Sequence, residues 1–187
     1  MSIDPGGQRT LLEVAREAIA HGAAHARAPV LAPEHYPEAL RAIACSFVTL
    51  HLGGALRGCI GSLHAHQPLV SDVASHAFGA AFSDARFIPV GRHEVAALHI
   101  HISILSALQP VAFETESQLL AALEPGTHGL LIALGQQRAT FLPAVWSSIS
   151  EPRDFLAALK SKAGMPAAGE GYGAWRYTTQ DFEEPRD

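Results

Sequence analysis

One short segment of the sequence concentrates residue types that can do chemistry. Cys59 lies between two glycines in the run Leu56-Arg57-Gly58-Cys59-Ile60-Gly61. A thiolate is a strong nucleophile, and a neighbouring arginine lowers the pKa of a thiol and orients anionic groups. Glycine inside a strand marks a bulge or a close approach, so Gly58 and Gly61 could clear space for a ligand. The run therefore predicts a nucleophile or thiolate ligand at Cys59, or else a small buried thiol in a tight crossing.

Other candidate residues flank this run or lie far from it. Ser62 follows the run directly, and we expect a substrate cleft around residues 57–62. Arg57 could bind a substrate anion or pair with a carboxylate such as Asp84, and a structural ion pair is the commoner use. His128 follows a Pro-Gly turn and opens a predicted strand, so it is either a turn residue or a general base for Cys59.

Histidines recur at strand spacing in two places. His64 and His66 are two residues apart, as are His99 and His101, so each pair shares one face of a strand and could bind a metal with His76 or His128. Eleven histidines also produce such pairs by chance, and an imidazole on a polar face is ordinary. We therefore predict no metal site and no cofactor.

The elements that must position Cys59 follow from the spacing of apolar residues. Two β-rich runs around Gly53-Gly54 predict a hairpin, whose turn is either the two glycines or residues 51–54. The two turns give different registers, so the residue opposite Cys59 stays open. Further strands are expected at 98–105, 130–134, 139–142 and 175–182, and helices at 8–25, 68–83, 117–123 and 152–162. This order predicts an α+β fold with a mainly antiparallel sheet flanked by helices.

Strand alternation predicts which way Cys59 points. Arg57, Cys59 and Gly61 share one face, and Leu56, Gly58 and Ile60 share the other. The apolar pair Leu56 and Ile60 should face the core, which turns Cys59 and Arg57 toward the polar side. A bulge at either glycine would break this pattern.

Composition excludes several classes of protein. The chain has 187 residues, of which 48% are hydrophobic, enough for a core without a disulfide or metal. Its net charge is −5 and no basic run occurs, which argues against binding to nucleic acid or to a membrane surface. We see no signal peptide or membrane-spanning run, so we expect a cytoplasmic protein in which Cys45 and Cys59 are free thiols.

The run Leu56 to Gly61 resembles the hallmark hexapeptide of the AMMECR family, the domain named after the AMME chromosomal region. Segments around it agree in the same order: 47–50, 81–89, 102–106, 126–130, 141–145 and 155–164. The resemblance thus covers residues 8–182. Two positions depart from the family pattern, since Ala144 stands where Gln is common and His101 where Glu is frequent.

The resemblance implies one domain over 8–182, with a main lobe and a smaller lobe, and flexible tails at 1–7 and 183–187. It adds Asp84 and Arg86 to Gly58, Gly61 and Ser62 as expected substrate-binding residues. The family is protein A of the AmmeMemoRadiSam system, which implies a Memo-like protein and a radical-SAM enzyme as partners. It implies no reaction, and the oligomeric state is open.

Three functions remain as alternatives. The first is a protein that binds a small molecule or a modified residue around residues 57–62, beside those partners. The second is a stand-alone cysteine enzyme, with Cys59 as nucleophile and His128 or another histidine as base. The third is a non-catalytic module whose surface binds another protein.

Overall fold

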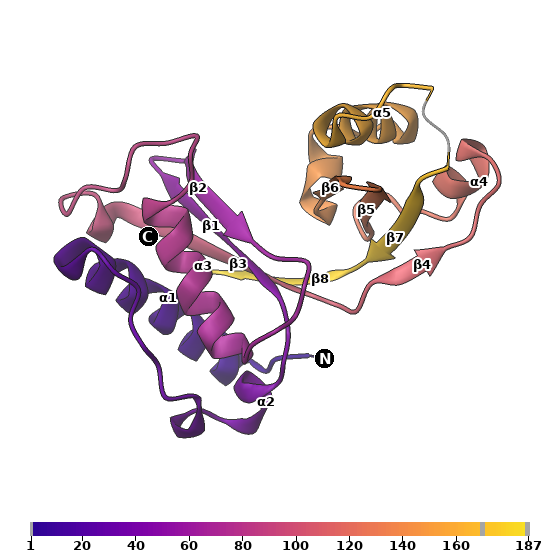
Figure 1. Cartoon of the computed structure of the whole chain (residues 1–187). Coiled ribbons are helices and arrows are strands. Elements are labelled where there is room, and N and C mark those ends of the chain that lie inside the picture. The colour runs from indigo at the N-terminus through magenta and orange to yellow at the C-terminus, as the bar shows by residue number, and fades with distance from the viewer. Residues whose placement is uncertain (1, 169–170, 186–187) are drawn as a thin grey trace. The chain divides into compact units, whose positions relative to one another are not determined.

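The computed structural model describes residues 2–168 and 171–185, which form two compact units (Figure 1). Unit 1 comprises Met1–Leu105 and Gln180–Asp187, and unit 2 comprises Ser106–Thr179. Each unit holds a four-stranded sheet and helices, and the strand pairs with a defined register are antiparallel. The predicted α+β fold with antiparallel sheets is confirmed.

Helix α1 of unit 1 spans Pro5–His25 and begins three residues before the predicted helix. The Asp4 carboxylate caps it by accepting the Gly7 N–H at 2.7 Å, and Pro5 suits the first turn because its missing N–H would have no helical partner. Ile3, placed in a predicted tail, is buried in the core. Met1, Arg186 and Asp187 lie outside the described residues.

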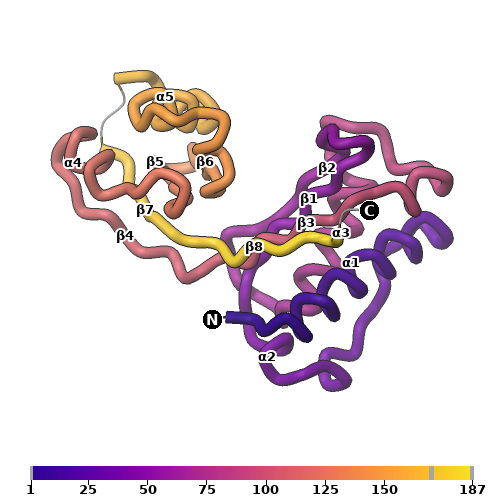
Figure 2. Tube along the Cα trace, turned by 180° about the vertical axis from the view of Figure 1, so that it is seen from behind, coloured from indigo at the N-terminus to yellow at the C-terminus, as the bar shows by residue number. Residues whose placement is uncertain are grey.

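The sheet of unit 1 has the strand order β2-β1-β3-β8. Its strands are β1 (Ser46–Leu52), β2 (Ala55–Gly61), β3 (Leu98–Leu105) and β8 (Thr179–Glu183). Figure 2 shows β8 lying along β3. β1 and β2 are joined by Gly53 and Gly54 alone, at φ of 58° and 82°, values that a two-residue hairpin turn demands and glycine adopts freely. This turn sets Leu52 opposite Ala55 and His51 opposite Leu56, and a one-residue bulge beyond them brings Thr49 opposite Cys59.

Two helices cover one face of this sheet. Helix α3 (Leu69–Phe82) packs on β1 and β2, and α1 packs on α3 and β3. Between the helices and the sheet lie fully buried side chains such as Val48, Leu50 and Ile102. The remaining elements of unit 1 are short: η1 (Pro33–His35), α2 (Glu38–Arg41) and η2 (Val95–Ala97).

A bulge in β2 breaks the alternation expected from the sequence. Leu50 lies opposite Gly58 and His51 opposite Leu56, so Arg57 is the extra residue. Gly58 is buried and Ile60 packs against the core as predicted, but Leu56 is 42% exposed. The placement of Leu56 in the core was therefore wrong, because the bulge turns the strand before Gly58.

Unit 2 contains a sheet of order β4-β7-β5-β6. Its elements are β4 (Gln109–Val111), α4 (Glu116–Ala121), β5 (Gly129–Leu134), β6 (Gln137–Phe141), η3 (Pro143–Ser147), α5 (Pro152–Ala163) and β7 (Gly173–Tyr177). The predicted last strand at 175–182 is in fact two strands, β7 in this sheet and β8 in the sheet of unit 1. Within the described ranges, no helix is long and apolar enough to cross a bilayer.

Candidate functional site

The two glycines of the hexapeptide serve close packing. A Cβ at Gly58 would lie 2.0 Å from the carbonyl oxygen of Ala80, where α3 crosses β2. A Cβ at Gly61 would lie 2.2 Å from the ring of Phe47. The expectation that these glycines leave room for a ligand was wrong, because protein atoms fill both spaces.

The backbone of Cys59 is held by a carboxylate and a guanidinium. β2 is the edge strand, and Asp84 Oδ2 accepts the Cys59 N–H at 2.9 Å while Arg86 Nη2 donates to the Cys59 carbonyl at 3.3 Å. Arg86 and Asp84 form a two-bond pair, Nε to Oδ1 at 3.0 Å and Nη2 to Oδ2 at 2.7 Å. Asp84 and Arg86 therefore bond the outward-facing N–H and carbonyl of Cys59, which on an edge strand have no neighbouring strand as partner.

The Asp84–Arg86 pair stays ionised over a wide pH range. Hydrogen bonds from the Arg86 side chain, then from the Cys59 and Arg86 N–H groups, outweigh burial and hold the pKa of Asp84 well below its usual range. The pKa of Arg86 is raised, first by its hydrogen bond to Asp84, and its guanidinium donates to the Cys59 carbonyl. Arg86 is thus the cation that interacts with Cys59.

Arg57 forms a structural ion pair, the commoner of its two predicted uses, but with a different carboxylate. Its Nε and Nη2 donate to the Glu94 carboxylate at 2.9 and 3.0 Å, and its Nη1 donates to the carbonyl of Ile88 at 2.9 Å. The carboxylate partner is Glu94, where the sequence suggested Asp84. Because each of its three guanidinium nitrogens donates to a protein oxygen and its side chain is only 11% exposed, Arg57 ties the segment after α3 to β2.

Glu94 should make the stability of unit 1 depend on acid pH. Hydrogen bonds from Arg57, then from the Gly91 N–H, lower the pKa of Glu94 to about 2. A depressed carboxyl pKa adds stability above the unfolded value of about 4.3, and that stability is lost as pH falls toward the folded value. We expect Glu94→Gln to lower the free energy of unfolding at pH 7 and to match wild type near pH 2. Urea titrations across this range test this, with exposed Glu17→Gln as control, and a deficit that persists at pH 2 would contradict it.

A row of four side chains crosses the sheet face opposite α1 and α3. Cys59, Thr49 and His101 occupy paired positions on β2, β1 and β3, and Asp181 follows on β8. Thr49 Oγ1 donates to Cys59 Sγ at 3.3 Å, and His101 Nε2 lies 3.7 Å from Asp181 Oδ1. Asp181 also accepts from buried Ser103. We call this face, defined by those four residues, the polar face.

A cleft of about 710 Å³ opens in unit 1 at one end of the polar face. Its lining includes His51, His99 and Glu183. His51 lies two residues from Thr49 on β1, and His99 lies two residues from His101 on β3. Its far side contains the Arg16–Glu184 ion pair. The cleft is lined by none of residues 57–62, where we had expected one. Ser62 instead closes the turn after β2, its hydroxyl bonding the N–H and carbonyl of His64.

His128 has a structural role in unit 2. Its Nδ1 accepts the Glu124 N–H at 3.0 Å, and its carbonyl accepts Trp146 Nε1 at 2.7 Å. Burial, followed by the charge of Arg176, lowers the pKa of His128. The turn role is present, whereas its pairing with Cys59 stays a prediction because the two residues belong to different units.

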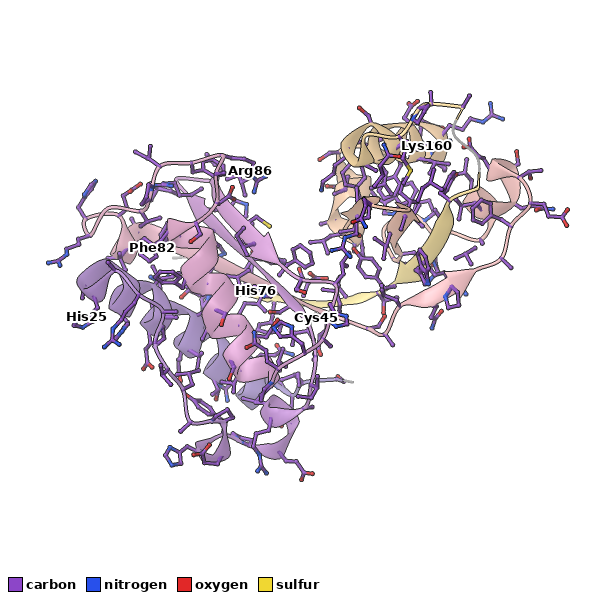
Figure 3. All side chains as sticks on the ribbon, viewed as in Figure 1. His25, Cys45, His76, Phe82, Arg86 and Lys160 are labelled. Carbon is purple, nitrogen blue, oxygen red and sulfur yellow. The ribbon has the colours of Figure 1, made fainter. Side chains whose placement is uncertain are left out.

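A second cluster, Ser46, Asp72 and His76, contains the residue types of a catalytic triad but not its geometry. The Ser46 hydroxyl donates to the Asp72 carboxylate at 2.7 Å, and Ser46 and Asp72 are fully buried. His76 Nδ1 lies 3.3 Å from the same hydroxyl and 3.1 Å from the Asp72 carboxylate, so one ring nitrogen meets both groups. In a triad the aspartate and the serine bond opposite nitrogens of the ring and the serine faces substrate, whereas Ser46 is buried. Figure 3 shows His76 and Cys45 toward one end of the sheet and Arg86 toward the other. This cluster therefore anchors the start of β1.

Both cysteines are free thiols, as predicted. Within the part of the chain that the structure describes, no three His, Cys, Asp or Glu side chains are grouped to hold a metal ion. Asp181, Glu183 and Glu94 were missed from the sequence. No local pattern marks them, because only the chain's return as β8 and the loop after α3 bring them to the sheet.

Comparison with known proteins places these features in a family. The AMMECR1 family model matches residues 12–182. A protein of Methanothermobacter thermautotrophicus is 33% identical over 171 residues, covering 89% of this chain and 85% of its own. Protein MJ0810 of Methanocaldococcus jannaschii is 33% identical over 157 residues, covering 81% and 78%. The crystal structure of the uncharacterized protein PH0010 from Pyrococcus horikoshii has a TM-score of 0.87 and 29% identity, covering 94% of this chain and 90% of that one.

Proposed function

Because the chain belongs to the AMMECR1 family, we propose that its motifs build one binding site, centred on Cys59 and the polar face, for a small molecule or a modified residue. One observation carries this proposal. Two motif segments separated in sequence meet at Cys59, since Asp84 and Arg86 of the second segment bond the N–H and carbonyl of that residue. Such an arrangement holds a side chain in a defined place on a rigid strand.

The other residues of the hexapeptide have packing roles, which supports Cys59 as the centre of the proposed site. Gly58 and Gly61 serve close contacts, Ile60 packs against the core, and Arg57 is engaged with Glu94. Cys59 is the partly exposed hexapeptide residue whose side chain joins the row of the polar face. The cleft beside His51 and His99 gives the rest of a ligand a place on the same face.

A cysteine enzyme is the second candidate, and one contact favours it. The Thr49 hydroxyl donates to the Cys59 sulfur at 3.3 Å and so holds it on the polar face, where a nucleophile could meet a substrate. A cysteine enzyme also needs a general base. His101, which is paired with Asp181 and lies one strand beyond Thr49, is the histidine of the row and the candidate for that base. A Memo-like protein and a radical-SAM enzyme, implied by the family's system, are the partners that we propose for either function.

The binding proposal predicts that small molecules are retained by the intact polar face. Purified protein is incubated with a cell extract of small molecules, and retained masses are measured by native mass spectrometry. We expect a mass that wild type retains and Thr49→Trp loses, because the indole fills the centre of the face. Exposed Glu17→Lys on α1 is the control and should retain it. Equal retention by Thr49→Trp, or no retained mass, would reject the proposed site.

A further inference from the structure

Arg86 presents an unused hydrogen-bonding edge beside the thiol. Its Nε and Nη2 bond Asp84, and Nη2 also bonds the Cys59 carbonyl. Nη1 has no hydrogen-bond partner among the described residues, and the side chain is 57% exposed. The guanidinium carbon also lies 5.4 Å from the centroid of the Phe87 ring. The group is therefore held on one edge and available on the other.

Three other arginines of unit 1 donate side-chain hydrogen bonds, and each differs from Arg86 in one of two ways. Arg57 and Arg16 use Nε, Nη1 and Nη2 in bonds to protein oxygens. Arg92 donates to the carbonyls of Ala23 and Ala24, at the end of α1 and away from Cys59. A guanidinium fixed by a carboxylate loses little freedom when it binds a second oxyanion, since its orientation is already set.

We infer that the Cys59 site takes ligands that carry an oxyanion, such as a carboxylate, and that the Nη1 edge of Arg86 binds this group. The inference rests on the proposed function and names the ligand class of the same site. The contact of Arg86 Nη2 with the Cys59 carbonyl at 3.3 Å places the guanidinium against the residue that carries the thiol. An anionic group bound there would hold the rest of the ligand next to the sulfur.

Two alkylating reagents of similar size test this inference. Iodoacetate carries a carboxylate where iodoacetamide carries a neutral amide, and with both the Cys59 sulfur forms the S–C bond, iodide leaves and the thiol proton passes to buffer. The measured quantity is the ratio of the two rate constants at Cys59, followed by peptide mass spectrometry. Iodoacetamide reports any change in the thiol or the fold, so the ratio isolates the effect of charge.

We expect Arg86→Gln to lower the iodoacetate-to-iodoacetamide ratio about three- to tenfold, as expected for loss of a charge-assisted hydrogen bond at a half-exposed site. Arg92→Gln changes the net charge equally and should leave the ratio unchanged. Arg86→Lys, which keeps the charge and loses the fork, should fall between. An unchanged ratio in Arg86→Gln, or an equal fall in Arg92→Gln, would overturn the inference while leaving the proposed site intact. If neither reagent labels folded protein at Cys59, the proposed site fails as well.

Discussion

Gly58→Ala is expected to lower the free energy of unfolding of unit 1 by about 3 kcal/mol or more. The new Cβ would lie 2.0 Å from the Ala80 carbonyl oxygen, and that atom belongs to the backbone of α3. A backbone atom cannot swing away as a flexible side chain does, so α3 and β2 must separate along their contact. The core between the helices and the sheet would open with them.

The matched control lies on the other side of the same contact. A Cβ at Gly79 of α3 would lie 3.2 Å from Ile60 Cγ2, a side-chain atom, and alanine also favours the helix. Gly79→Ala should therefore cost less than about 1 kcal/mol. Urea unfolding followed by far-UV circular dichroism measures both variants. Should Gly58→Ala match Gly79→Ala, the packing explanation for the hexapeptide glycine would be wrong.

Much of the fold could be predicted from sequence because its signals are local. The strict alternation of β3 and the Gly53-Gly54 turn determine strands and pairing through short-range geometry. The bulge at Arg57 was not predictable, because it depends on tertiary packing. It shifts the pairing of β1 and β2 by one residue where Gly58 packs against α3. The split of the last predicted strand was missed for a similar reason, because one run of strand-forming residues, 175–182, contributes to β7 and β8 in different sheets.

The candidate site, like the fold, could be predicted only where its signals are local in sequence. Cys59 and Asp84 could be picked out as candidates because they lie in motif segments, and they do meet. Their ionic partners could not be assigned, since Arg57 and Arg86 are both plausible partners for Asp84 in sequence. The structure pairs Arg57 with Glu94 and Arg86 with Asp84, which moves the cation at the thiol from Arg57 to Arg86.

Cys59 is expected to react with iodoacetamide about 100-fold faster than Cys45 at neutral pH. Cys45 is 8% exposed, and burial, followed by the charge of Asp72, raises its pKa. A buried thiol reacts only when the structure opens locally, and an opening free energy of about 3 kcal/mol slows it by about 100-fold. Cys59 is half-buried, accepts a hydrogen bond from Thr49 and interacts with Arg86. Burial therefore keeps the Cys45 thiol inert, whereas the partly exposed Cys59 sulfur can meet the reagent in the folded protein.

The most direct test of the claim that Cys59 marks the functional site is the rate of modification of each cysteine in folded protein, resolved by peptide mass spectrometry. Cys59→Ser and Cys45→Ser variants assign the two rates, and labelling in urea gives the rate of the unfolded chain. The account predicts that Cys59 is modified about 100-fold faster than Cys45 in the folded state and that the difference disappears in urea. Equal rates in the folded state, with both cysteines protected relative to urea, would contradict it and show that Cys59 is a structural thiol.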